Sequence, residues 1–156
     1  MNIIRVIMDR EGNIVSRTEK FGFREKMLVR ATKEGYLKVV RGLLALGTNP
    51  SIFEDAPARA AVYYNRPEIL KILLKDRRIN LDRITQYAMK WGIQKGYNDI
   101  IDIALNNKEV DPVMENNPIK YALAWGKKDV VNKLLKDERF IDGLMEDSRS
   151  NRRMTV

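Results

Sequence analysis

Apolar residues recur along the chain with a period of about thirty residues. The recurring feature is a pair of apolar residues, found at Leu43-Leu44, Leu73-Leu74, Ala104-Leu105 and Leu134-Leu135, and successive pairs are 30, 31 and 30 residues apart. A second apolar pair lies about one helical turn earlier in each case, at Val39-Val40, Ile69-Leu70, Ile100-Ile101 and Val130-Val131. Residues at this spacing share one face of a helix. A period of this length predicts stacked units that bury their apolar faces against each other.

Each unit carries a turn residue ahead of this apolar stripe. The turn residues are Gly35, Asn65, Gly96 and Gly126. Glycine adopts a left-handed backbone without steric cost and asparagine tolerates it, so a tight turn between two helices is expected at each position. Pro57, Pro67 and Pro118 are expected at the beginnings of helices, where a missing N–H is harmless. Each unit is therefore predicted to contain a short helix, a tight turn and a second helix.

The pattern divides the chain into three parts. Residues 1–24 contain β-branched residues, then turn residues, then further apolar residues, which predicts a β-hairpin cap and a connector. Residues 25–142 form the repeats, with units at 25–55, 56–86, 87–117 and 118–142. Residues 143–156 are polar and are expected to form a flexible tail. The predicted fold class is all-α, a solenoid of about four helical pairs behind a β-hairpin cap.

Composition excludes several kinds of chemistry. The chain contains no cysteine and no histidine, which removes disulfides, thiolate zinc sites and the Ser-His-Asp triad. Neighbouring acids such as Glu54-Asp55 do not define a catalytic pair, and Gly42 and Gly47 lack the Gly-Lys-Ser/Thr ending of a phosphate-binding loop. We therefore expect no enzymatic activity, no cofactor and no metal. No apolar run approaches the roughly 20 residues that cross a bilayer, so we expect no membrane association and a cytoplasmic location.

The net charge of +8 is unevenly distributed along the chain. Basic residues exceed acidic ones by four in residues 56–86, whereas acidic residues exceed basic ones by two in residues 87–117. The candidates for binding nucleic acid are Arg59, Arg66, Arg77, Arg78 and Arg83, with Tyr63-Tyr64 nearby as a stacking platform. The alternative is that these charges form a solvated outer face, which is more common.

The first half of each unit resembles an ankyrin repeat, whose first helix has the pattern Thr-Pro-Leu-His-x-Ala-Ala-x-x-Gly. Residues 117–126 match this pattern best, residues 56–65 follow, and residues 26–35 and 87–96 keep the small-residue and glycine positions without the proline. The units are shorter than the usual 33 residues, and the histidine position holds Val29, Arg59, Lys90 and Lys120. Gly92 replaces an alanine of the pattern. Short units that end in Leu-Leu-Lys-Asp-Arg-Arg or Leu-Leu-Lys-Asp-Glu-Arg, as residues 73–78 and 134–139 do, are similar to divergent ankyrin arrays of giant viruses, amoebae and some large phages.

The resemblance implies that three variable positions of each first helix line a concave groove. They hold Arg30, Lys33 and Glu34, then Ala60, Tyr63 and Tyr64, then Trp91, Gln94 and Lys95, and finally Tyr121, Ala124 and Trp125. Aromatic side chains on a rigid groove are typical of interface hot spots. The alternative is that these aromatic residues belong to the core. Phe53 and Met114, at the tips of loops between units, are further candidates for contact, although Phe53 could equally pack beneath its loop.

The resemblance implies a non-enzymatic module that binds another protein. Arg30, Lys33 and Lys95 would attract an acidic surface of the partner. If the origin is viral, the partner would be a host factor that the chain blocks or redirects. The alternative function is a nucleic-acid-binding accessory protein that uses the basic second unit. A third option is self-association through an end that exposes Val130, Leu134 and Phe140, so the chain is expected to be a monomer or a homodimer.

Overall fold

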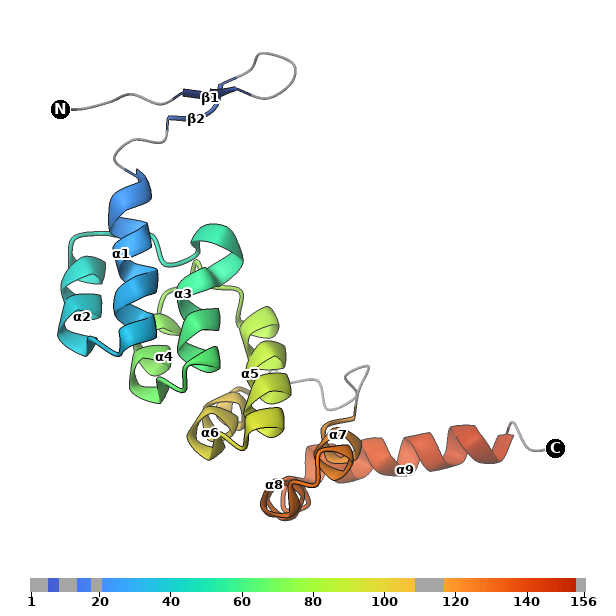
Figure 1. The fold of residues 1–156 in the computed structure, drawn as a ribbon. Coiled ribbons are helices and arrows are strands. Elements are labelled where there is room, and N and C mark those ends of the chain that lie inside the picture. Colours follow the sequence, from blue (N-terminus) through green and yellow to red (C-terminus); the bar gives the residue numbers. More distant parts are fainter. Residues whose placement is uncertain (1–5, 9–13, 18–20, 109–116, 154–156) are drawn as a thin grey trace. The chain divides into compact units, whose positions relative to one another are not determined.

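The computed structural model describes residues 6–8, 14–17, 21–108 and 117–153 (Figure 1). The chain divides into two compact halves, Met1–Ile79 and Asn80–Val156. From here on, the first and second unit are these two halves, and each helix–turn–helix segment of about thirty residues is a helix pair. Helices form the main structure of both units, as the predicted all-α class requires. In the described residues these helices form four pairs, two in each unit, and a longer helix follows the last pair.

Two short strands precede the helices of the first unit. Strand β1 (Val6–Met8) pairs antiparallel with β2 (Ile14–Arg17), and an irregularity in the register lies between Ile7 and Met8. The predicted turn at residues 9–13 lies outside the described residues. The predicted cap over the first helix pair is not seen, because the main contacts of the strands are with each other and Met27 and Val39 of the first pair stay exposed.

The first unit contains two helix pairs, which are α1 (Phe21–Glu34) with α2 (Leu37–Ala45) and α3 (Ile52–Tyr63) with α4 (Pro67–Leu73). The turn residues Gly35 and Asn65 have positive φ values of 84° and 52°, which confirms the predicted left-handed turns. Helix α3 packs against α1, and α4 packs against α2. The two pairs are therefore stacked side by side in this unit (Figure 1).

The second unit repeats this arrangement and adds a last helix. Its pairs are α5 (Leu81–Lys95) with α6 (Asn98–Asn106) and α7 (Pro118–Ala124) with α8 (Lys128–Leu134). Gly96 and Gly126 have φ values of 72° and 66°, again as predicted for the turns. Helix α7 packs against α5, and a salt bridge of 2.7 Å between Lys133 Nζ and Asp102 Oδ1 joins α8 to α6.

The apolar stripe of the second helices forms much of the core in each unit. Val40 and Leu43, then Ile69, Leu70 and Leu73, then Ile100, Ile101 and Ala104, and finally Val130 and Leu134 are buried. Burial of such side chains is the main favourable term in folding, at about 1.5–3 kcal/mol each. Val39 and Leu135 differ from the predicted inward stripe, because their side chains are exposed in the first and fourth helix pairs.

The C-terminal end differs from the sequence-based interpretations in two respects. The third option, self-association through an end that exposes Val130, Leu134 and Phe140, does not describe the structure, because all three residues are buried. Residues 143–153 were expected to form a flexible tail, whereas α9 (Glu138–Arg153) is helical throughout this region. The physical reason is that helical spacing continues beyond Phe140 to the half-buried Leu144, so Gly143 does not end the pattern.

Candidate binding surfaces

In the first unit, basic and aromatic side chains lie close together at the C-terminal ends of α1 and α3. Lys33 Nζ lies 5.2 Å from the ring centroid of Tyr64, within the range of a cation–π interaction. The rings of Tyr63 and Tyr64 lie 5.1 Å apart in an edge-to-face arrangement. Both tyrosines and Lys33 are exposed. We call these three residues the first aromatic surface, and the predicted residues Arg30 and Glu34 are exposed on the same helix, α1.

The second unit has a larger group of this kind. Lys95 Nζ lies 5.7 Å from the ring centroid of Trp91, and the rings of Tyr121 and Trp125 lie 6.2 Å apart. The Tyr121 hydroxyl donates a long hydrogen bond of 3.4 Å to Gln94 Oε1, which connects α7 to α5. Trp125 is exposed, whereas the other four residues are half-buried. We call these five residues the second aromatic surface.

The two surfaces occupy equivalent positions in their units. Tyr64 and Trp125 each precede the turn residue of their helix pair, at the C-terminal boundary of α3 and α7. The alternative that the aromatic residues form the core does not describe Tyr63, Tyr64 or Trp125, which are at least one-third exposed. The packing there is supplied by Ala61 and Ala122. The helices thus direct the small residues inward and the aromatic rings toward the solvent.

Phe53 lies on an unusual turn at the beginning of α3. Phe53, Glu54 and Asp55 all have positive φ values, 48°, 55° and 61°, which non-glycine residues rarely adopt. Arg59 stabilises this turn because its guanidinium donates to the carbonyl oxygens of Phe53 at 2.7 Å and Glu54 at 3.0 Å. The Phe53 side chain is exposed, so it does not pack beneath its loop. Met114 lies outside the described residues.

The arginines predicted to hold nucleic acid are largely engaged within the protein. Arg59 holds the turn just described, and Arg66 Nε donates to the carbonyl oxygen of Lys33 at 3.2 Å. Arg78 forms two side-chain hydrogen bonds with Asp76, at 2.9 and 2.7 Å. Arg77 is exposed in the first unit, and Arg83 is exposed at the start of α5 in the second unit. Arg59, Arg66 and Arg78 therefore have roles within the protein that sequence reasoning missed.

Two carboxylates have clearly perturbed acidity. Hydrogen bonds from Arg78 hold the pKa of Asp76 below its ordinary value, although partial burial opposes this effect. Arg139 lowers the pKa of Asp137 in the same way. Arg139 also donates to the carbonyl oxygens of Leu105 and Asn107, at 2.8 and 3.1 Å, so this pair links α9 to the end of α6. These shifts belong to structural ion pairs and give no indication of a catalytic centre.

Other functional features are sparse in the described residues. The part of the chain that the structure describes contains no group of three or more acidic side chains placed to hold a metal ion. None of the described helices combines the length and the apolar character that crossing a membrane requires.

Sequence reasoning did not identify Tyr97 as part of the second unit's aromatic group, although Lys95 Nζ lies 5.9 Å from its ring centroid.

Comparison with known proteins does not assign the chain to a family. No family model matches the chain, and no curated protein matches its sequence. The class that the structure defines is accordingly a helical protein with stacked helix pairs and two exposed aromatic surfaces.

Proposed function

We propose that the chain is a non-enzymatic repeat protein of the ankyrin type, which binds a partner protein in the cytoplasm through its aromatic surfaces. Four turn residues with positive φ support the repeat class, because they occur at a constant place between the two helices of each described pair. The second helices bury equivalent apolar residues, which also supports a common repeat unit. The match of residues 117–126 to the ankyrin pattern supports the family assignment.

The observation that carries the binding proposal is the exposure of Tyr64 and Trp125 at equivalent positions in the two units, each directly before a turn residue. Lys33 Nζ lies over the ring of Tyr64 in the first unit, and in the second unit Lys95 Nζ lies over the half-buried ring of Trp91. Aromatic side chains with few rotatable bonds bury a large area at a small cost in conformational entropy. Helices hold them in place, so little further ordering is needed when a partner binds.

Charge indicates the chemistry of the partner. The net charge is +8, and Arg30 and Lys33 are exposed on α1 beside the first aromatic surface. Such charges attract an acidic partner surface and raise the rate of encounter more than the final affinity. A partner with an apolar patch and an acidic rim fits this arrangement. If the chain is viral, this partner is a host protein that the chain blocks or redirects.

A decisive experiment is affinity capture from a lysate of the cells in which the chain occurs, with nuclease treatment. We expect Tyr64→Ala and Trp125→Ala to lose proteins that the wild-type chain retains, since hot-spot truncation costs about 2 kcal/mol or more. Leu46→Ala is the matched control, because Leu46 is an exposed apolar residue at the end of α2 that belongs to neither aromatic surface.

Two results would contradict the proposal. Both aromatic variants could retain the same proteins as the control, in which case the aromatic surfaces do not bind them. Captured proteins could instead disappear after nuclease treatment, which would favour the nucleic-acid alternative. Binding of labelled oligonucleotides that collapses as salt increases, and that Arg77→Glu abolishes, would give the same answer.

A further inference from the structure

Two positions are fully buried in the first and third helix pairs, each of which is followed by another pair in its unit. They are the residues three before and five after the turn residue. In the first pair these are Thr32 and Val40, each 0% exposed, and in the third pair they are Ile93 and Ile101, 1% and 0% exposed. Helix α3 packs on α1 in the first unit, and α7 packs on α5 in the second. Burial is thus complete at these two positions where another helix pair follows in the same unit.

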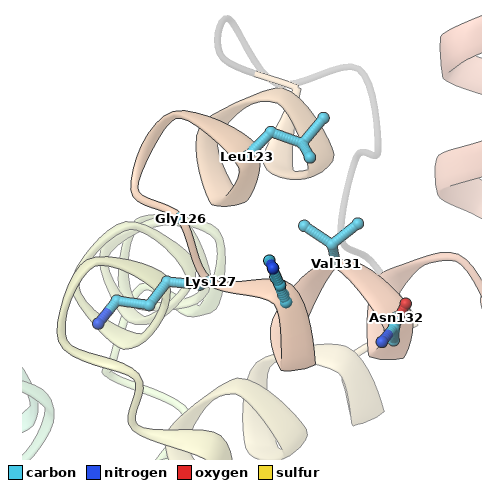
Figure 2. A pocket seen from close by; sticks show the side chains of 6 residues that line it. Leu123, Gly126, Lys127, Val131 and Asn132 are labelled. Carbon is cyan, nitrogen blue, oxygen red and sulfur yellow. The ribbon is translucent and has the colours of Figure 1, made fainter.

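In the part of the chain that the structure describes, the fourth pair is followed by the single helix α9 and by no further helix pair. Its equivalent residues are Leu123, which is 61% exposed, and Val131, which is half-buried. Figure 2 shows these two side chains on the same side of α7 and α8. They line a hollow of about 290 Å³ together with Gly126, Lys127, Lys128 and Asn132. We call Leu123, Gly126 and Val131 the trailing face.

The space around the turn glycine also differs between the fourth pair and the first and third pairs. A Cβ atom on Gly35 would lie 3.0 Å from the guanidinium of Arg66, which belongs to the following pair. A Cβ on Gly96 would lie 3.8 Å from Lys127 Nζ, again from the following pair. At Gly126 no described atom lies within 4 Å of the same position. A side chain at the start of a following second helix would fill this space.

The first helix pair carries the opposite half of such a junction. A second set of buried positions, in the pairs that follow another pair of the same unit, lies eight before and four after the turn residue. Pro57 and Ile69 are buried at these positions in the second pair, and Pro118 and Val130 are buried in the fourth. The equivalents in the first pair are Met27 and Val39, which are 38% and 42% exposed. Tyr36 occupies the position of Arg66 and Lys127 and is 60% exposed. We call Met27, Tyr36 and Val39 the leading face.

We propose that a second copy of this chain occupies the trailing face, with its own leading face stacked on it. The proposal rests on the proposed repeat class and is independent of the aromatic surfaces. Tyr36 of the second copy would lie over Gly126, as Arg66 lies over Gly35 within one chain. Met27 and Val39 of the second copy would cover Leu123 and Val131. The occupant is a second copy because the chain itself presents both halves of the junction in the same register.

This arrangement has two physical consequences. The interface joins two different faces, so association continues from copy to copy and does not stop at a two-fold dimer. Both faces are also basic, since Lys38 and Arg41 are exposed beside Val39, while Lys127 and Lys128 line the hollow. Like charges repel, and salt screens them, so association strengthens as ionic strength rises. Binding to nucleic acid or to an acidic partner depends on salt in the opposite direction.

Sedimentation velocity of the full chain tests the proposal. The mean sedimentation coefficient should rise with protein concentration, and more steeply in about 0.5 M than in about 0.05 M sodium chloride. Leu123→Lys blocks the trailing face and Val39→Lys blocks the leading face, because each adds a positive charge where the opposing face is already basic, so each variant alone should associate at least about tenfold more weakly. Phe53→Lys is the matched control, because Phe53 is an exposed residue that belongs to neither face, and it should associate like the wild type.

Mixing the two blocked variants gives the sharpest result. Each variant keeps one intact face, so an equal mixture should form dimers and no larger species. Circular dichroism checks that both variants fold, and Leu123→Ala and Val39→Ala replace them if the charged variants unfold. These alanine variants should weaken association by a smaller factor.

Several results would overturn the proposal. One is a wild-type chain that remains monomeric at every concentration and salt level. Another is association that Leu123→Lys or Val39→Lys leaves unchanged, and a third is a mixture that fails to form dimers although the wild type associates. If Leu123→Lys lost association while Val39→Lys kept it, the chain would form a two-fold dimer, and this would also overturn the proposal. Capture of partner proteins by Leu123→Lys, compared with Trp125→Ala, shows separately whether the proposed function holds.

Discussion

The close approach of α5 and α6 at Gly92 allows a quantitative test of the packing. A Cβ atom at this position would lie 2.9 Å from Cγ1 of Ile101, a side chain that is fully buried. The equivalent small residues in the first and fourth pairs are Ala31 and Ala122, and valine takes the place of Ile101 in both pairs. The third pair therefore combines the smallest first-helix residue with a larger second-helix residue.

The expected effect of Gly92→Ala follows from two opposing contributions. Alanine in the middle of a helix is favoured over glycine by about 0.8–1.0 kcal/mol. Overpacking against Ile101 costs about 1–3 kcal/mol, since a contact of 2.9 Å forces the buried side chain to move. The net change is a loss of about 0–2 kcal/mol in the free energy of unfolding. At Gly42 in α2 no atom lies within 4 Å, so Gly42→Ala should instead gain about 0.5–1 kcal/mol.

A double mutant separates the overlap from other effects of the substitution. Ile101→Val alone should cost about 0.5–1.5 kcal/mol, because it removes a buried methyl group. Combined with Gly92→Ala it should cost less than the sum of the two single changes, by about 0.5 kcal/mol or more. Valine keeps the Cγ atom that the new Cβ would meet, but it lacks the Cδ1 methyl group, so the smaller side chain has space to move away from the alanine.

Urea unfolding followed by far-ultraviolet circular dichroism measures these free energies. Fluorescence of Trp91 and Trp125 reports on the second unit alone, since both tryptophans lie within Asn80–Val156. The two signals show whether the units unfold in one transition, which the comparison with Gly42→Ala requires. If Gly92→Ala stabilised the chain as much as Gly42→Ala, or if the double mutant were strictly additive, the close approach of α5 and α6 would be refuted.

Three further predictions concern the core, the second aromatic surface and an ion pair. Leu73→Ala should lower the free energy of unfolding by about 2–5 kcal/mol and Lys71→Ala by no more than about 0.5, and equal losses in urea unfolding would refute the helix register. Trp125→Ala should shift the thermal midpoint by less than about 4 °C, because this side chain is exposed, and a larger loss would place it in the core. Arg139 lowers the pKa of Asp137, so the carboxylate stabilises the fold above the ordinary pKa of 3.8, and this stability is lost as the pH falls through the lowered folded-state value. Asp137→Asn should therefore be less stable at neutral pH and approach the wild type in acid, and an unchanged difference across this range would contradict the ion pair.

The helical class and the turns could be predicted from the sequence because both depend on local patterns. Glycine at positions 35, 96 and 126 is tied to a left-handed backbone, and Pro67 and Pro118 begin α4 and α7 as expected, whereas Pro57 lies inside α3. The turn at Phe53, Glu54 and Asp55 could not be predicted, since none of these residues favours positive φ. Its conformation depends on hydrogen bonds from Arg59, which sequence patterns do not reveal.

For the candidate surfaces too, the features that depend on a local pattern could be predicted, and those that depend on a neighbouring element could not. The exposure of Tyr64 and Trp125 could be predicted because helical periodicity places them opposite the small residues that pack inward. The exposure of Val39 and Leu123 could not, because both continue an apolar pattern whose other members are buried. A local pattern specifies which face of a helix is apolar, but a neighbouring element decides whether that face is covered. The ends of a stacked structure are therefore where sequence periodicity and burial separate, and where a further binding partner has apolar surface to bury.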